Sequence, residues 1–257
     1  GALMANPRGF LEVHRVKSPE RSPEERVHDY GEIFGTLPEE ELREQAGRCM
    51  DCGVPFCNSA CPLGNLIPDW NDLARVGDWK GAIAQLHATN NFPEFTGLIC
   101  PAPCESACVL DIDDDPVMIK QIEYWTINHA FEQGWVVAEP PETRTGKTVG
   151  VVGSGPAGMA AAAELNKVGH TVTVYERDEA PGGLLRFGVP DAKLEKWMID
   201  RRIELLEQEG VEFICDVDVG RDISADELRA KHDAVVLATG SRVERDLEVA
   251  GRELDGV

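Results

Sequence analysis

Two parts of this chain differ in the spacing of their hydrophobic residues. Before about residue 140, apolar positions recur at helical spacing, and long loops that contain most of the cysteines separate the helical stretches. A Thr-x-x-Glu capping box, an N-terminal Asp and a C-terminal Gly mark helix ends. The predicted helices run from the capping box Thr36–Glu39 into Cys49, from Asp78 through Leu86, and from Val117 to about Gln133, closed by Gly134.

After a polar, proline-containing linker at 140–147, short apolar runs alternate with longer helical patterns. The predicted strands are Thr148–Val152, Thr171–Tyr175, Val211–Cys215 and Ala234–Ala238, and the predicted helices are Pro156–Val168 and Lys193–Glu209. This alternation is typical of a doubly wound, mainly parallel sheet. The predicted fold class is therefore α/β, with an all-α domain at 4–139, a linker at 140–147 and a Rossmann-like domain at 148–257.

Composition narrows the possible partners. With 257 residues and 42 % hydrophobic content, the chain has room for two folded domains. A net charge of −21 argues against nucleic acid or an anionic membrane as a partner, and we interpret 113–115, a run of three aspartates, as a solvated turn. No apolar run approaches the roughly 18 residues of a membrane span. We interpret residues 1–3 as a cloning remnant and, finding no targeting segment, expect a cytoplasmic protein.

Seven of the eight cysteines lie in one window of about sixty residues, as Cys49-x2-Cys52-x4-Cys57-x3-Cys61-Pro62 and Cys100-x3-Cys104-x3-Cys108. This spacing favours iron–sulfur ligands, which serve electron transfer. Structural zinc is an alternative, although zinc ribbons favour two CxxC knuckles and this chain has one. Disulfides would need an oxidising compartment. Cys215, in an apolar run, is expected to be a buried strand thiol with no chemical role.

The predicted helix after Pro116 has a carboxylate among its apolar residues. Glu123 shares a stripe with Ile119 and Ile127, because residues four apart lie on one helix face. Burying an ionised carboxylate costs several kcal/mol unless it is paired or bound to metal. Either Glu123 reaches solvent or an arginine from the edge of the stripe, or it is a buried ligand. Two four-iron clusters need about eight ligands, and the window supplies seven cysteines, so Glu123 is the candidate for the eighth.

Between the first predicted strand and its helix lies a complete G-x-G-x-x-G, formed by Gly153, Ser154, Gly155, Pro156, Ala157 and Gly158. Its glycines permit a tight turn, close approach of a pyrophosphate, and close packing of helix on strand. Glu176 ends the second strand, where a ribose hydroxyl is held, so the motif predicts a dinucleotide site for NAD or FAD and disfavours NADP. The histidines are scattered, and we predict no catalytic residue in the chain.

Together these features resemble the small (β) subunit of NADPH-dependent glutamate synthase, over essentially all of residues 6–257. The resemblance rests on long matches rather than on one motif. They are Gly9–Glu12, Arg48–Cys57, Cys61–Pro68, Ala88–Gly97, Cys100–Glu105, Gly182–Pro190 and Ala238–Gly240.

The resemblance implies two [4Fe–4S] clusters in the N-terminal domain and FAD at the glycine motif. In proteins with this N-terminal architecture, including dihydropyrimidine dehydrogenase, the ligand sets interleave between the two cysteine runs. One cluster would use Cys49, Cys52, Cys57 and Cys108; the other would use Cys61, Cys100, Cys104 and Glu123. The flavin contacts implied in the same way are Gly153–Gly158, Glu176, Arg177, Gly183, Leu184 and Lys193, with Ile99 and Val219 as further candidates.

The resemblance also implies a function and a partner. A flavin accepts a hydride from NADPH and releases electrons singly, and the two clusters would pass them to the large (α) subunit, which makes glutamate from glutamine and 2-oxoglutarate. The alternatives are a related oxidoreductase, such as a dihydropyrimidine dehydrogenase or a bifurcating ferredoxin:NADP reductase, and a non-catalytic interaction domain held together by metal.

The family has a second dinucleotide-binding domain, for NADPH, inserted in the flavin domain. This sequence has no second G-x-G-x-x-G and stops at Val257, about where that insertion is expected. We therefore expect a flavin domain that is truncated before the NADPH domain. Such a chain would bind FAD weakly or not at all and would not oxidise NADPH efficiently alone; NADPH would bind only to the full-length protein.

Overall fold

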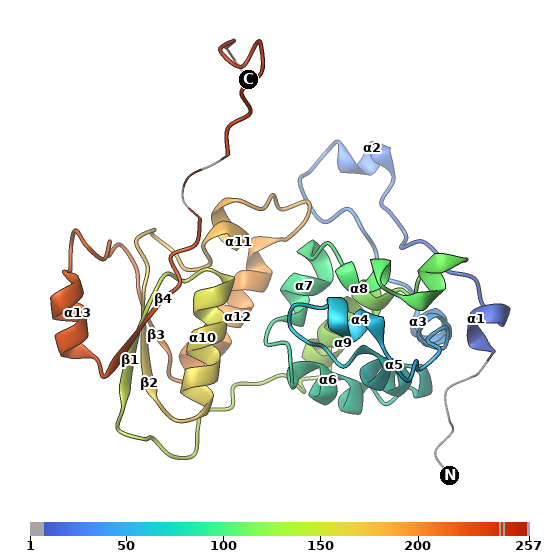
Figure 1. The fold of residues 1–257 in the computed structure, drawn as a ribbon, viewed down its shortest axis with the longest axis horizontal. Helices are drawn as coiled ribbons and strands as arrows, with labels where there is room; N and C mark the ends of the chain where they lie inside the picture. Colours follow the sequence, from blue (N-terminus) through green and yellow to red (C-terminus); the bar gives the residue numbers. More distant parts are fainter. Residues whose placement is uncertain (1–7, 242, 244, 256–257) are drawn as a thin grey trace. The chain divides into compact units, whose positions relative to one another are not determined.

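A computed structural model describes residues 8–241, 243 and 245–255 (Figure 1). By packing, the chain divides into two compact units: residues up to Pro140 together with Leu185–Glu209, and Pro141–Leu184 together with the residues from Gly210 on. Several positions named above lie outside the described residues. They are residues 1–3, interpreted as a cloning remnant, the expected domain start at 4, the start of the resemblance at 6, and the chain end at 256–257. The domain boundaries stay a prediction, and packing groups 185–209 with the N-terminal unit.

The first unit is helical. Its elements are α1 Gly9–Glu12, α2 Pro23–Arg26, α3 Glu39–Ala46, α4 Phe56–Ala60, α5 Ile67–Val76, α6 Trp79–His87, α7 Pro93–Ile99, α8 Pro103–Ser106, the 3-10 helix η1 Val109–Ile112, α9 Ile119–Glu132 and α12 Lys196–Gln208. The short helix α11, Leu184–Phe187, begins at the boundary between the units.

Helix α9 forms the centre of the first unit, and α5, α6 and α7 pack against it. Its apolar face contributes Ile119, Ile122 and Ile127, which are almost fully buried. Helix α7 approaches α9 closely because Gly97 has no side chain: a Cβ there would lie 2.8 Å from the Cα of Tyr124. This close approach places the residues before Gly97 against the middle of α9.

The second unit contains a parallel sheet. Within the described residues, β1 Thr148–Val152, β2 Thr171–Tyr175, β3 Glu212–Ile214 and β4 Ala234–Leu237 form one four-stranded sheet in the order β3-β2-β1-β4. Helices α10, Pro156–Lys167, and α13, Ala225–Lys231, lie on opposite sides of the sheet (Figure 1). The central strand β1 is buried after its first residue, which explains why it reads as a continuous apolar run.

Most predicted elements of the second unit are confirmed, with β1 and β2 at the predicted bounds. The C-terminal ends of β3, β4 and α10 each shift by one residue. The helix predicted at Lys193–Glu209 is α12 of the first unit; it begins at Lys196, and Lys193 lies in the preceding turn. Cys215 follows β3 and is half-buried, so the prediction of a buried strand thiol is wrong. Helix α13 was missed although Ser224 and Glu227 form a capping box, the sequence signal that marks its start.

In the first unit one predicted cap is wrong. Helix α3 has Pro38 as its N-cap and no side-chain capping bond, so Thr36 does not form the expected box. Glu39 Oε1 instead accepts a hydrogen bond from Trp79 Nε1 at 2.8 Å, because the indole N–H needs a partner where α6 packs. The cap of α6 is confirmed: Asp78 Oδ1 accepts from the Gly81 N–H at 2.9 Å. Gly134 also closes α9 as expected, with φ at +66°.

A buried ion pair joins α7 to α12 inside the first unit. Arg202 Nε and Nη2 donate to the two carboxylate oxygens of Glu94 at 2.6 and 3.0 Å. The side chain of Arg202 is 9 % exposed and that of Glu94 is 0 % exposed. Removing either partner therefore leaves the other as an unpaired charge with little access to water.

We predict that Glu94→Gln lowers the free energy of unfolding by about 3–5 kcal/mol, because Arg202 is left as an uncompensated buried cation. Urea denaturation of the cluster-free chain measures the change. Asp72→Asn, which removes the partly exposed α5 pair with Arg75, is the control and is expected to cost no more than about 1 kcal/mol. Equal effects of the two variants would contradict the assignment.

Candidate functional site

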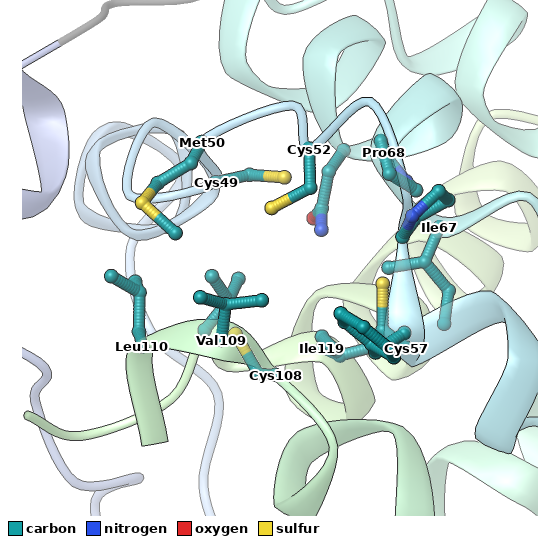
Figure 2. A pocket seen from close by; sticks show the side chains of 14 residues that line it. Cys49, Met50, Cys52, Cys57, Ile67, Pro68, Cys108, Val109, Leu110 and Ile119 are labelled. Carbon is teal, nitrogen blue, oxygen red and sulfur yellow. The ribbon is translucent and has the colours of Figure 1, made fainter. Parts of the chain in front are cut away.

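Four of the predicted ligands surround one hollow in the first unit. Cys49 and Cys52 lie in the loop between α3 and α4, Cys57 lies in the first turn of α4, and Cys108 directly precedes η1. Their four sulfurs point into a common space (Figure 2). The hollow is lined by fourteen residues and is partly open to solvent. The structure therefore brings together the first predicted ligand set from chain segments about fifty residues apart.

The other walls of the hollow are almost entirely apolar. They consist of Met50, Pro55, Phe56, Ile67, Pro68, Val109, Leu110, Val117 and Ile119, with one amide, Asn71. Among the described residues, no group of three or more His, Cys, Asp or Glu side chains is arranged to hold a single metal ion. The eight cysteines all lie in the described ranges and are free thiols.

Burial controls the chemistry of these thiols. The pKa of Cys49 is raised to about 12, mainly by burial; a backbone hydrogen bond from Asp51 opposes the shift, and the neighbouring Cys57, Cys108 and Cys52 contribute to it. Burial likewise raises the pKa of Cys57 to about 11 and shifts the pKa of Cys52 upward. These thiols are therefore neutral near pH 7 unless a cation replaces their protons, as iron does when it binds thiolate.

The second predicted set is also gathered in the first unit. Cys104, at the start of α8, has its pKa raised to about 12 by burial and then by the charges of Glu105, Glu123, Cys61 and Cys100. Three of these four neighbours are the other members of the predicted set. Cys61 from the first run therefore lies near Cys104 of the second run, as interleaved ligand sets require; the assignment of the two sets stays a prediction.

Glu123 is buried on α9, with 6 % of its surface exposed. Its Oε1 accepts hydrogen bonds from Asn90 Nδ2 at 3.0 Å and from Thr96 Oγ1. Of the two alternatives, the one in which Glu123 reaches solvent or an arginine is wrong, because its carboxylate is buried and its donors are Thr96 of α7 and Asn90 before α7. Burial raises the pKa of Glu123 to about 7, while these two hydrogen bonds oppose the shift. Such a carboxyl exchanges its proton for a metal ion at near-neutral pH.

One cation anchors the start of the first cysteine loop. Arg48 is fully buried and donates to the backbone oxygens of Val13, Pro116 and Asp115 at 3.0, 2.9 and 2.8 Å. Its Nη2 also reaches Asp114 Oδ2 at 3.4 Å, while 113–115 is exposed as expected. In the sequence, Arg48 lies within the segment Arg48–Cys57, and nothing in the local pattern indicates that its side chain is buried.

The glycine motif forms the predicted turn between β1 and α10 in the second unit. Gly153 has φ at +98°, and a Cβ at Gly158 would overlap the carbonyl oxygen of Gly153. Gly155 differs from both: a Cβ there would meet no atom within 4 Å, and its φ is −64°. The space beside Gly155 is where a pyrophosphate would approach the backbone and the N-terminus of α10. A dinucleotide therefore fits this turn.

Glu176 is held at the end of β2 by this turn. Its Oε2 accepts from the backbone N–H of Ser154 at 2.9 Å and from the Ser154 hydroxyl, and its Oε1 accepts from the Asp178 N–H at 3.0 Å. Burial raises the pKa of Glu176, but the hydrogen bonds outweigh burial and the net pKa is lowered. The carboxylate is thus ionised and fixed, as an acceptor for a ribose hydroxyl must be. Ser154 Oγ also accepts from the Gly182 N–H at 3.0 Å, which places Gly183 beside Gly155.

The other predicted flavin contacts are less closely connected to the turn. Arg177 is exposed and pairs with Asp178 at 3.4 Å, Leu184 is exposed, and Val219 packs against the core near Val152. Ile99, at the end of α7, is half-buried, and Lys193 is exposed; both belong to the first unit. These five assignments stay predictions.

Two family models match the chain. The model described as "Dihydroprymidine dehydrogenase domain II, 4Fe-4S cluster" matches residues 26–135. The model described as "NAD(P)-binding Rossmann-like domain" matches residues 151–208. The chain therefore has a 4Fe–4S domain followed by an NAD(P)-binding Rossmann-like domain, which confirms the predicted fold class.

Curated relatives match nearly all of the chain. The glutamate synthase [NADPH] small chain of Mycobacterium tuberculosis (strain H37Rv) is 58 % identical over 255 residues, covering 99 % of this chain and 52 % of its own length. The chain belongs to the glutamate synthase small-chain family. The Bacillus subtilis small chain is 51 % identical over 99 % of this chain and 53 % of its own length. The glutamate synthase [NADH] of Saccharomyces cerevisiae is 51 % identical over 97 % of this chain and 12 % of its own length.

This chain spans about half the length of the small chains of its family that it matches. The resemblance stated from the sequence is confirmed. None of the described helices has the length and apolar character needed to cross a membrane.

We predict that Arg48→Met lowers the free energy of unfolding by about 3 kcal/mol or more, because three backbone carbonyls lose the charged donor that they share. Arg48→Lys is expected to recover only part of the loss, since an ammonium group lacks the planar fork of donors. Thermal and urea unfolding measure both variants. Arg43→Met, on the half-buried face of α3, is the control, and a cost equal to that of Arg48→Met would contradict the anchoring role.

A second prediction separates fold from ligand binding at the glycine turn. Gly158→Ala is expected to cost about 1–3 kcal/mol of stability, because its methyl group overlaps backbone. Gly155→Ala is expected to leave stability unchanged or slightly raised, because its φ suits alanine, and to weaken nucleotide binding by filling the pyrophosphate space. Urea unfolding and fluorescence titration with FAD measure the two effects. Equal stability losses, or full FAD affinity in Gly155→Ala, would contradict these assignments.

Proposed function

We propose that this chain is an electron-transfer part of a glutamate synthase. In this proposal, FAD binds at the glycine turn, and electrons pass through two [4Fe–4S] clusters to a large subunit that converts glutamine and 2-oxoglutarate into two glutamates. The observation that carries the proposal is the gathering of the thiols into two sets. Cys49, Cys52, Cys57 and Cys108 surround one hollow, and Cys61, Cys100 and Glu123 each lie near Cys104.

Each set has a defined task in this proposal. The clusters would supply one-electron chemistry once bound. The apolar walls of the hollow limit water around the first set, and burial keeps the thiols of Cys49, Cys52 and Cys57 protonated until iron displaces the protons. Glu123, held by Asn90 and Thr96, would supply the fourth ligand of the second set. No side chain of this chain is required as a general acid or base, because a hydride needs none.

The flavin assignment rests on the same kind of support. Gly155 leaves space for the pyrophosphate, and Glu176 is ionised and oriented for a ribose hydroxyl. We propose FAD rather than NAD or NADP at this turn. In the relatives named for NADPH, that nucleotide is the electron source, and we propose that it binds outside the residues of this chain. Free thiols favour a reducing compartment such as the cytoplasm.

A second candidate function has one observation in its favour. The family model at 26–135 carries the name of dihydropyrimidine dehydrogenase, so the iron–sulfur domain alone suits a pyrimidine reductase equally well. The identities of 51–58 % to glutamate synthase chains over both units favour the first proposal. Binding and electron transfer to a glutamate synthase large subunit separate the two.

We predict about eight iron and eight acid-labile sulfide atoms per chain after anaerobic purification or reconstitution. Cys49→Ser and Cys61→Ser are each expected to lose one cluster, and the double variant both, because each removes a ligand from a different set. Iron and sulfide analysis with EPR of the reduced chain measures this. Cys215→Ser is the control and is expected to keep the full content. Zinc in place of iron, or loss of both clusters from a single variant, would contradict the proposal.

A second experiment tests electron transfer to the large subunit. The chain is reduced chemically for this assay, so that no nicotinamide site is needed. Mixed with a glutamate synthase large subunit, glutamine and 2-oxoglutarate, the reduced chain is expected to support glutamate formation. The cluster-deficient double variant is expected to support none. Equal glutamate formation with the double variant would contradict the role of the clusters.

A further inference from the structure

Asn71 is the one polar side chain, besides the thiols, among the residues that line the hollow. It lies on α5 and is fully buried, with 0 % of its surface exposed. Neither its Nδ2 nor its Oδ1 has a hydrogen-bond partner among the described residues. Leaving a buried amide unpaired costs about 1–3 kcal/mol, whereas a leucine of similar shape would fill the same wall without that cost.

The surroundings of Asn71 limit what can satisfy it. The hollow otherwise presents apolar side chains and the sulfurs of Cys49, Cys52, Cys57 and Cys108. Because neither end of the amide is bonded, it rotates about χ2 without losing a hydrogen bond. An anionic group in the hollow therefore selects the orientation in which the NH₂ group faces it.

We propose that Asn71 donates an N–H···S hydrogen bond to the iron–sulfur cluster held by Cys49, Cys52, Cys57 and Cys108, and thereby sets its reduction potential. This inference rests on the proposed function, since it needs a cluster in the hollow. Asn71 binds no iron and is a positioning residue. Its donor stabilises the reduced cluster more than the oxidised one, because reduction adds negative charge to the sulfurs. The hydrogen bond thus raises the potential of this cluster.

Redox titration followed by EPR tests the inference on the full chain with both clusters loaded. Asn71→Leu is expected to shift the potential of the first cluster to a more negative value and leave that of the second unchanged. A Cys61→Ser background, which keeps only the first cluster, assigns the signal. In cluster-free protein the same variant is expected to match or exceed the parent in thermal stability, since it removes an unpaired amide.

The matched control is Trp70→Phe. Trp70 precedes Asn71 on α5, is fully buried, and has an indole N–H without a partner, but it does not line the hollow. Trp70→Phe therefore removes a comparable buried donor and is expected to leave both potentials unchanged. A shift of equal size in the two variants would overturn the inference, because it would then arise from general repacking of α5.

A second measurement uses the parent protein and keeps the inference testable if Asn71→Leu fails to fold. With ¹⁵N placed in asparagine side chains, pulsed EPR of the reduced first cluster is expected to show coupling to an amide nitrogen. Its absence overturns the inference, as does an unshifted potential in a fully loaded Asn71→Leu chain; in both cases the proposed function stands. A parent chain that takes up no cluster overturns the proposed function itself.

Discussion

In the first unit, the positions of the first cysteine loop and of α9 depend on the buried guanidinium of Arg48. Arg48 is fully buried, and its guanidinium binds the carbonyl oxygens of three residues from two distant segments, Val13 before α3 and Asp115 and Pro116 before α9. A guanidinium in this position is stable only while its donors remain paired. Because Cys49 is the next residue, the same hydrogen bonds fix where the first cysteine loop begins. They also fix where α9 begins, and with it the position of Glu123. Arg48 therefore positions both Cys49, which begins the first ligand set, and α9, which carries Glu123 of the second set.

Burial then determines how these ligands behave. Thiols with a pKa near 11 or 12 remain neutral, and a carboxyl with a pKa near 7 is only partly ionised. A group that binds as an anion in such places gains its charge when iron arrives, so cluster insertion and folding are coupled. Burial has the opposite net outcome at Glu176, where backbone and hydroxyl donors outweigh it and keep the carboxylate charged. Both side chains have little exposed surface, and the balance between burial and hydrogen-bond donors sets the pKa of each, which is raised at Glu123 and lowered at Glu176.

Close backbone approach has the same importance in both units. Gly97 allows α7 to approach α9, which brings Thr96 to Glu123. In the second unit Gly158 allows α10 to approach β1, and Gly183 lies against Gly155. Among the three glycines of the G-x-G-x-x-G turn, Gly155 alone has open space beside it, which distinguishes the glycines that the fold requires from the one that a ligand requires. Single methyl groups at these positions therefore have separable effects on stability and on binding.

The sequence by itself determined the two-part organisation, the parallel sheet, the bounds of β1 and β2, the glycine turn and the family, because periodicity, turn residues and cysteine spacing are local properties of a chain. It also identified Glu123 as anomalous, since a charge on an apolar stripe is visible in sequence.

The sequence did not determine the partners of Glu123, the burial of Arg48 or the unpaired amide of Asn71. Each depends on contacts between segments far apart in the chain: Asn90 and Thr96 with α9, Val13 and Pro116 with Arg48, and α5 with both cysteine loops. Thr36 and Cys215 show the same limit, because packing by Trp79 and the early end of β3 overrode sound local signals. Local chemistry names the candidate residues, and only the tertiary structure decides what each one touches.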